Sequence, residues 1–364
     1  MKFMDLDYQL SSIDEEVFPK IKEIIGNNEF IGGAELKMFE KEFSEYIKCK
    51  HCVGVGNGTD ALEIAIETLD MPKGSEIIVP SNSFVASSEA VTRCGHKVVF
   101  ADIDKETLLI TPNNIDEVIT DNTRAIICVH LYGNPCNLKD IKDYCKDKNI
   151  FLIEDCAQAH GAHYESYYVG SSGDIAAWSF YPGKNLGAFG DAGAVTTNNP
   201  DYEKKARAIA NHGRLDKYNH FMEGRNSRMD NLQAGVLRIK LRHLNNWTNI
   251  RIRNASIYDS ELADNKNILL QKKDELSKHV YHLYVIRVND RDKFQGYLLE
   301  NNVQTSIHYP ILLPQLDAYK YMHQRTLSRL LNDNLANTLI SLPVGEHLAE
   351  KDIHNIVKVI KEYS

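Results

Sequence analysis

The sequence lacks the features that would place the protein in a membrane, outside the cell or on a nucleic acid. No stretch is apolar for the roughly 18 residues that a membrane span needs, and the N-terminus, MKFMDLDYQLSSIDEE, has no apolar run of signal-peptide length. An excess of positive charge is also absent, because 42 Lys and Arg face 50 Asp and Glu, a formal net charge of -8. Such a chain has no general attraction for nucleic acid or anionic lipid, so local groups must hold any phosphate-bearing ligand. We expect a cytoplasmic protein without nucleic-acid or membrane partners.

Paired cysteines are also scarce. Seven cysteines in 364 residues of an intracellular chain are expected to stay reduced and partly buried. Cys49 and Cys52 have the spacing of a zinc or redox pair, but no second pair lies at a useful distance and Cys52 opens an apolar strand. We therefore expect no metal site. Repeats, low-complexity tracts and long linkers are absent too, and a composition of 43% hydrophobic and 25% charged residues indicates a globular protein with one large core and one smaller core.

Short apolar runs, rich in Val and Ile, alternate with helix-length segments through the first half of the chain. Because the runs are apolar throughout instead of alternating with polar residues, they predict a parallel sheet covered by helices on both faces. The runs are CVGV (52–55), EIIVP (76–80), KVVFADI (97–103), AIICVHL (125–131) and IFLIED (150–155).

The second half begins differently. After GAVTT (193–197) we predict a helix to about His212, the polar loop GRLDKYNHFMEGRNSRMD, and an apolar-rich helix from Asp230. That helix carries two apolar stripes, so more than one face is buried and the helix fits between domains or subunits. The stripes are Leu237, Leu241 and Leu244, and Leu232, Val236 and Ile239.

From about residue 250 the pattern becomes a long helix, a strand in YHLYVIRV (281–288), a helix, a strand in VQTSIH (303–308) and terminal helices. We predict a large α/β domain over 1–245, which includes the N-terminal segment, and a smaller α+β domain over 246–364.

Ligands of open parallel sheets bind where the strands end and helices begin. GNGTDALEIAI follows the first strand there: Gly56 and Gly58 allow close approach of a ligand, and Thr59 and Asp60 open a helix whose free N–H groups suit a phosphate. The third glycine of a dinucleotide fingerprint is missing, and a tight turn without a ligand explains the motif equally well.

Two further polar groups stand at the ends of later strands. IEDCAQAHGA places Asp155 at a strand tip, where it either caps the following segment or pairs with a cationic ring nitrogen. Lys184 follows in SFYPGKNLGAFGDAGAV, just after Ser179. A phosphate turn, a strand-tip aspartate and a loop lysine are together the three parts of a pyridoxal phosphate site, since the aspartate keeps the pyridinium protonated and the lysine bonds the aldehyde.

Essentially the whole chain from Asp5 onward resembles the fold-type-I sugar aminotransferases of the DegT/DnrJ/EryC1/StrS family. The resemblance lies in FIGGAELKMFEKEF (30–43), GNGTDAL, EDCAQAHGA, SFYPGKNLGAFGDAGA and GRNSRMD, which occur in the family's order. It implies the family fold, a large domain with a mostly parallel sheet flanked by helices and a small C-terminal α+β domain, and pyridoxal 5'-phosphate as the cofactor. The resemblance also implies a homodimer with shared active sites.

The resemblance assigns a role to each motif. It makes Lys184 and Asp155 catalytic, and it places Asn226 on the cofactor phosphate of the other subunit. Phe84 would stack on the cofactor ring, although a core aromatic is the alternative on sequence alone, and His308 could equally be a satisfied strand-end histidine. The remaining implied contacts are Gly58, Thr59 and Ser179 on the phosphate, Gln158 on the ring hydroxyl, and Phe30, Gly32, Tyr181, His308 and Tyr309 on the substrate.

The lysine loop also bears on the reaction. Family members with histidine at the Lys184 position are dehydratases, so Lys184 implies transamination, and YPGKNLGAFGDAGAV is similar to enzymes that aminate C3 of a 3-keto sugar. The resemblance is closest to the dTDP-3-keto-6-deoxyhexose 3-aminotransferases. It implies transfer from L-glutamate, through pyridoxamine phosphate, to a dTDP-linked 3-keto-6-deoxyhexose for lipopolysaccharide O-antigen or another cell-surface glycan. Alternatives are a C4 aminotransferase of a dTDP- or UDP-4-keto sugar, a UDP-3-keto-uronate aminotransferase, and a non-catalytic cofactor-binding homologue.

Overall fold

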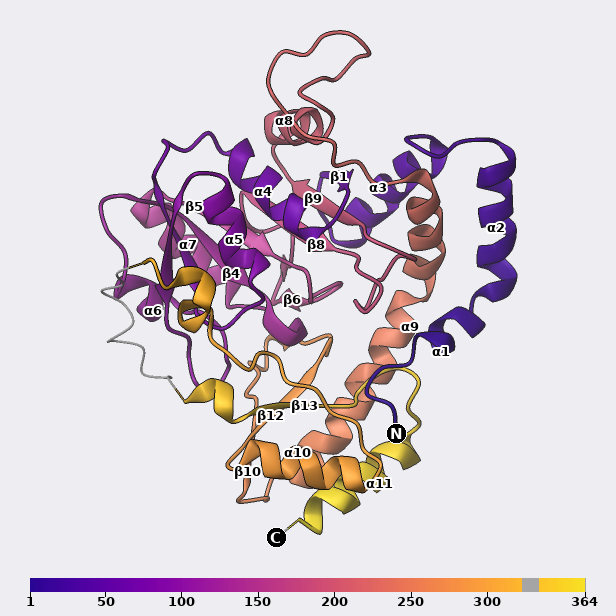
Figure 1. The fold of residues 1–364 in the computed structure, drawn as a ribbon, viewed down its shortest axis with the longest axis vertical. Coiled ribbons are helices and arrows are strands. Elements are labelled where there is room, and N and C mark those ends of the chain that lie inside the picture. The colour runs from indigo at the N-terminus through magenta and orange to yellow at the C-terminus, as the bar shows by residue number, and fades with distance from the viewer. Residues whose placement is uncertain (323–333, 364) are drawn as a thin grey trace.

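The computed structural model describes residues 1–322 and 334–363 (Figure 1). At its centre lies a seven-stranded sheet in the order β1-β9-β8-β5-β4-β2-β3. Only β9 runs antiparallel to its neighbours in this sheet, while the other adjacent strands pair in parallel. The predicted, mostly parallel sheet is therefore confirmed. The strands are β1 (His51–Val55), β2 (Glu76–Pro80), β3 (Lys97–Ala101), β4 (Thr123–Val129), β5 (Phe151–Asp155), β8 (Ile175–Ser179) and β9 (Gly193–Thr197).

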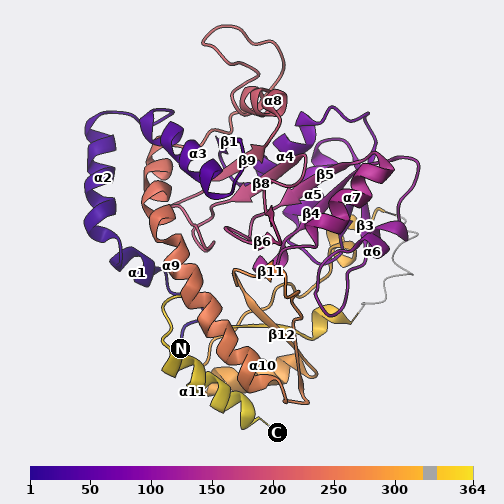
Figure 2. The ribbon, with the colours of Figure 1, turned by 180° about the vertical axis from the view of Figure 1, so that it is seen from behind.

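Helices flank this sheet, so the strands are buried nearly along their whole length, as their continuous apolar sequences predict (Figures 1 and 2). At the start of α4 the side chain of Asn57 accepts the N–H of Asp60, which caps the helix directly after β1. The helices of this part are α3 (Ala34–Tyr46), α4 (Gly58–Thr68), α5 (Ala86–Arg93), α6 (Pro112–Asp116), α7 (Leu138–Lys148) and α8 (Pro200–Ala210).

A single helix, α9 (Asn231–Leu262), links the two hydrophobic cores. Leu237 and Leu244 belong to the core around the large sheet, whereas Tyr258 and Leu262 belong to a second core beneath it. The predicted domain boundary at residues 245 and 246 falls inside this unbroken helix. The division into two domains stays a prediction.

The second apolar stripe of α9 has a partner within the same chain. Val236 and Ile239 pack with Ile13 and Val17 of the segment that enters α2 (Asp14–Gly26), and α2 lies beside α9 in both views (Figures 1 and 2). Gly235 makes this approach possible, because a Cβ there would lie 2.6 Å from Cδ1 of Ile24. A second subunit is thus not needed to bury this stripe.

The lower part of the molecule is built on a small antiparallel sheet, β10-β12-β13, with α10 and α11 beside it (Figure 1). The predicted strand 303–308 is wrong. Within this segment Ser306 makes one isolated bridge with Ser341 of β13, and the chain then continues to His308 and Tyr309, which line a cavity. The predicted terminal helices fall partly on residues 323–333, outside the described residues. The bounds are β10 (Ile268–Leu270), β12 (Tyr284–Val288), α10 (Arg291–Glu300), β13 (Leu339–Leu342) and α11 (Glu350–Lys361).

The remaining elements are short. The helix α1 (Leu6–Ser11) follows an N-terminal strand-like segment that meets the lower part of the molecule, where Met1 O accepts the N–H of Gln304 at 3.1 Å. A third sheet joins β11 (Ser277–Lys278) to β6 (His163–Tyr164) and β7 (Tyr167–Tyr168). None of the helices in residues 1–322 and 334–363 is long and apolar enough to cross a lipid bilayer.

Candidate active site

A cavity of about 940 Å³ opens where β1, β5 and β8 end. The three turns that leave these strands carry the motifs singled out from the sequence, so one parallel sheet edge brings them together. Of the thirteen predicted site residues, ten line this cavity and three do not. The ten are Gly58, Thr59, Phe84, Asp155, Gln158, Ser179, Tyr181, Lys184, His308 and Tyr309.

The N-terminus of α4 forms one end of the cavity. No described residue accepts a hydrogen bond from the backbone N–H of Gly58 or Thr59, as expected for the first turn of a helix. Ser179 faces this turn closely: a Cβ at Gly58 would lie 2.6 Å from the Cβ of Ser179. Two free N–H groups, a hydroxyl and a helix N-terminus make a site suited to a phosphate group.

The carboxylate of Asp155 lies at the tip of β5 and is 6% exposed. Its Oδ2 accepts the hydroxyl of Ser87 at 2.7 Å, and its Oδ1 accepts the N–H of Ala157 at 3.2 Å. The second bond is the capping role that the sequence left open, while the first comes from α5 and fixes the carboxylate at the cavity wall. Ser83, which contacts Ser87 at 2.7 Å, extends this chain of hydroxyls.

Lys184 is a half-buried lysine that lines the cavity. Within the described residues no side chain or carbonyl accepts a hydrogen bond from its Nζ. Burial lowers the pKa of Lys184 from its ordinary 10.5 to about 8, and the Asp155 carboxylate opposes part of that shift. A lysine in this state has a sizeable neutral fraction near pH 7 and is a ready nucleophile.

Gln158 is held by a network on the opposite wall. Its Oε1 accepts the backbone N–H of Tyr132 at 2.6 Å, so its Nε2 is the donor to the hydroxyl of Tyr309 at 3.2 Å. The hydroxyl of Tyr132 in turn donates to the carbonyl of His308. This network joins the β4–α7 loop, the β5 motif and the segment 308–309 into one wall.

His308 is bonded through Nδ1 to the hydroxyl of Ser341 at 2.9 Å and stacks on Phe3 at 5.9 Å between ring centroids. Burial, with the charge of Lys184, lowers its pKa to about 4. His308 is therefore satisfied at one nitrogen, as the strand-end alternative supposes, yet it lines the cavity.

Two aromatic side chains stand open to the cavity. Phe84 is 53% exposed, which excludes the alternative of a core aromatic, and its ring lies 5.9 Å from that of Tyr309. Tyr181 is 59% exposed. Exposed rings at a cavity wall are suited to cover a flat ligand or a sugar ring.

Phe30, Gly32 and Asn226 are absent from the cavity lining: Phe30 and Gly32 belong to a segment that meets the start of α9, and Asn226 lies in the loop before α9, where it bridges Asn211. Ile31 pairs with Asp230 in an isolated bridge, and the carbonyl of Phe30 accepts the N–H of Asn231 at 2.9 Å. Asn226 is exposed, and its side chain accepts a hydrogen bond from Arg228 at 2.8 Å. The loop after α8 that leads to Asn226 extends beyond the rest of the ribbon at the top of both views (Figures 1 and 2).

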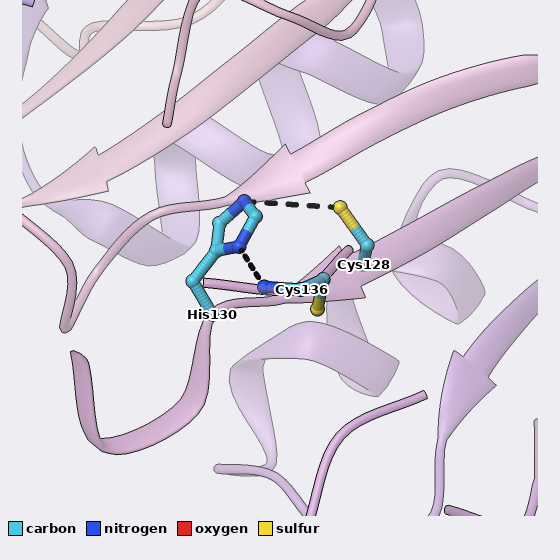
Figure 3. Close-up of side chains that lie close together, drawn as sticks. All are labelled: Cys128, His130 and Cys136. Atoms are coloured by element: carbon cyan, nitrogen blue, oxygen red, sulfur yellow. Dashed lines mark hydrogen bonds between the residues drawn. The ribbon is translucent and has the colours of Figure 1, made fainter. Parts of the chain in front are cut away.

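A buried cluster behind Asp155 has the composition of a metal site but not the free ligand atoms. Nδ1 of His130 accepts the N–H of Cys136 at 3.0 Å (Figure 3). Nε2 therefore carries the proton, which it donates to Glu154 at 3.1 Å. Cys128 lies 3.8 Å from the same Nε2. Both ring nitrogens are thus engaged. The cluster instead braces β5, because the N–H of His130 also donates to the carbonyl of Asp155 at 3.1 Å.

Several residues in and around the cavity were not predicted from the sequence. Ser83, which lines the cavity, and Ser87, which donates to Asp155, stand in the same PSNSFVAS that drew attention to Phe84. Phe3 and His282 had no signal in the sequence, since only the tertiary fold brings them to Lys184. The charged residues of the wall that were also missed are Glu63, Glu89, Arg93 and Asp191.

Comparison with known proteins identifies the family of the chain. Residues 11–361 match the model of the DegT/DnrJ/EryC1/StrS aminotransferase family. The chain belongs to that family. Its members are pyridoxal phosphate enzymes, so this chain is a pyridoxal phosphate-dependent aminotransferase of nucleotide-linked keto sugars that uses an amino donor.

Individual relatives are similar over almost their full length. The dTDP-3-amino-3,6-dideoxy-alpha-D-galactopyranose transaminase of Aneurinibacillus thermoaerophilus is 39% identical, with 99% of each chain covered. The crystal structure of S. venezuelae DesV is 35% identical and superimposes with a TM-score of 0.96 over 100% of this chain and 98% of that chain. The structure of ntda from Bacillus subtilis, solved with bound cofactor PMP, is 30% identical with a TM-score of 0.90 over 100% and 85%. Other curated relatives, at 32–36% identity, are named for UDP- or GDP-linked sugars.

Proposed function

We propose that the chain transfers the amino group of L-glutamate to C3 of a dTDP-linked 3-keto-6-deoxyhexose, giving a dTDP-3-amino-3,6-dideoxyhexose for a cell-surface glycan. The observation that carries the proposal is one amine without a hydrogen-bond acceptor among the described residues, Lys184, in the same cavity as the Asp155 carboxylate and the free N-terminus of α4. These groups match the aldehyde, the ring nitrogen and the phosphate of pyridoxal phosphate.

Each of these groups has a distinct task. When bound, pyridoxal phosphate supplies an aldehyde carbon and a cationic ring that withdraws electrons from it. The N–H groups of Gly58 and Thr59 and the hydroxyl of Ser179 bind the phosphate. Asp155 holds the proton on the ring nitrogen, because its own charge favours the cationic form. Lys184 takes the proton from Cα of glutamate with its Nζ, and in the second half-reaction it returns a proton to C3 of the sugar.

Two observations support a 3-keto-6-deoxyhexose linked to dTDP. The lysine loop YPGKNLGAFGDAGAV is of the kind found with C3 amination, and the relative at 39% identity is named for a dTDP-3-amino-3,6-dideoxy sugar. The relatives named for UDP- and GDP-linked sugars favour a second candidate, a 4-keto or 3-keto-uronate sugar on another nucleotide.

A shared active site in a homodimer is the second part of the proposal. Phe30, Gly32 and Asn226 do not line the chain's own cavity, and a second copy could present them to the first. Among residues 1–322 and 334–363 the cavity wall contains one arginine, Arg93, and this arginine is paired with Glu63 at 2.7 Å, so donors from a second subunit would help to bind a pyrophosphate. Apolar side chains near this patch are half-exposed and suited to an interface, namely Phe18, Ile25, Phe30, Ile31 and Met38.

The test is incubation with pyridoxal phosphate, L-glutamate and a panel of dTDP- and UDP-linked 3-keto and 4-keto sugars. Mass spectrometry and NMR of the product report the position and configuration of the new amine. We expect a 3-amino sugar on dTDP. A 4-amino product, or turnover of the UDP sugars alone, would contradict the proposed substrate but not the chemistry of Lys184.

A further inference from the structure

A second, smaller cavity lies beside Lys184. Its volume is about 20 Å³, and a cavity of roughly 10–15 Å³ is enough for one water molecule. Its wall is formed by the N-terminal segment, the lysine loop and the turns of the lower sheet, with Gln9 of α1, Arg251 of α9 and Glu346 among its residues. Lys184 and His282 line both this cavity and the large one. The two cavities therefore share a wall, to which Phe3, Met4, Gly183 and Leu283 also contribute.

Hydrogen bonds determine which ring nitrogen of His282 carries no proton. The amide nitrogen of Asn185 donates to the carbonyl of Val280 at 3.1 Å, so the other amide atom is the oxygen, which can only accept. That oxygen lies 3.1 Å from Nδ1 of His282, which must carry the proton. Nε2 of His282 is then left with a free lone pair, and no described residue donates to it.

The surroundings keep His282 in this neutral form. The side chain is 8% exposed, and burial is the main cause that holds its pKa well below the ordinary 6.5. Lys184, Arg251, His308 and His160 each add to the lowering, Lys184 the most, while the carboxylate of Glu346, which lines the same small cavity, is paired with Arg251 at 2.6 Å. Nε2 therefore stays a hydrogen-bond acceptor at neutral pH.

Two residues that line one water-sized chamber thus carry a donor and an acceptor for which the described residues supply no partner. A buried polar group without a partner is costly, and a single water can satisfy both groups at once. We propose that the small cavity is a water site in which one water molecule accepts a hydrogen bond from Nζ of Lys184 and donates one to Nε2 of His282. His282 is then a positioning residue, which holds the free lysine amine through this water.

The consequence for catalysis rests on the proposed role of Lys184. In each half-reaction the lysine leaves the cofactor and has to move a proton as a free amine. A fixed water behind it limits where the free amine can go. The water site itself belongs to the cofactor-free chain, so it can be tested apart from that role.

Two measurements on the cofactor-free full chain test the site. A crystal structure should show a water within hydrogen-bond distance of both Nζ of Lys184 and Nε2 of His282, and this water should be missing in His282→Phe. Competitive acetylation with acetic anhydride as a function of pH, read by mass spectrometry at Lys184, gives the pKa of the amine. Loss of the acceptor destabilises the ammonium, so His282→Phe should lower this pKa by about one unit.

His282→Gln retains an acceptor oxygen near the position of Nε2 and should keep the pKa of Lys184 close to the wild-type value. His279→Phe is the matched control, because His279 is also buried but its Nδ1 accepts the N–H of Tyr281 at 2.9 Å and it lines neither cavity. A chamber water that does not contact His282, or equal acetylation midpoints in all four chains, would overturn the proposal.

Discussion

Lys184 should react with pyridoxal phosphate at a neutral pH where an ordinary lysine is almost inert. With a pKa of about 8, about a tenth of Lys184 is the free amine at pH 7, whereas an amine with the ordinary 10.5 is about 0.03% free. The ratio predicts capture about 300-fold faster than for an unshifted lysine. The rate of capture should rise about tenfold per pH unit below pH 8 and level off above it, because the amine is then fully deprotonated.

The assay is stopped-flow absorbance of the cofactor-free chain mixed with pyridoxal phosphate between pH 6 and pH 10, with borohydride reduction and peptide mass spectrometry to locate the link. Lys184→Arg controls for binding without capture. Asp155→Asn removes the one group that opposes the burial effect, so its plateau should begin at a lower pH. A capture rate that keeps rising tenfold per unit through pH 10 would refute the argument, since Lys184 would then titrate like a surface lysine.

Four other outcomes are expected. Asp155→Asn should lower the turnover rate by on the order of a hundredfold or more, because it retains the size of the side chain but loses the charge that favours a protonated ring; near-parental steady-state rates would reduce Asp155 to a helix cap. Gly58→Ala should weaken cofactor binding at least about tenfold in an equilibrium titration, which is roughly the loss of one charge-assisted hydrogen bond. The control Gly296→Ala, where a Cβ meets nothing within 4 Å, should bind the cofactor normally. Mixing inactive Lys184→Ala subunits with impaired Asn226→Asp subunits should restore activity if sites are shared, and no recovery despite proven subunit exchange would argue that Asn226 serves its own chain. In the cofactor-free chain the lowered pKa of Lys184 means that the folded state binds fewer protons than the unfolded state between pH 8 and 10.5, so the buried ammonium destabilises the fold below pH 8. Lys184→Met should therefore raise the free energy of unfolding below pH 8 by about 1–3 kcal/mol, as measured by urea titration.

Sequence patterns predicted the strands of the large sheet, because the apolar pattern of each strand is contained in its own short segment. Five apolar runs became β1 to β5 with ends shifted by at most two residues, because strands buried on both faces have to be apolar throughout. The segment 303–308 failed because its residues suit a strand while its place at the cavity wall allows only the bridge at Ser306. The tertiary environment decided against the local preference there.

The second stripe of α9 shows the same limit. The periodicity correctly indicated that both faces are buried, but it could not tell whether a subunit or a nearby helix covers the second face, and the answer was α2. Within the site, Asp155 and Lys184 could be found because a carboxylate and a lysine are conspicuous where apolar strands end. His282 could not, since its importance lies in a tautomer that only Asn185 and Val280 determine.

The continuity of α9 limits how the molecule can move. A helix of 32 residues is about 48 Å long, and this one is anchored by Leu237 and Leu244 in one core and by Tyr258 and Leu262 in the other. The helix contains no internal proline, the commonest cause of a sharp kink. The upper and lower halves should therefore behave as one stiff body over this length, and large hinge closure around a substrate is disfavoured. Access to Lys184 must then be controlled by the segments that line the cavity, among them Phe3 and Met4, so substitutions there should change how fast a ligand reaches Lys184.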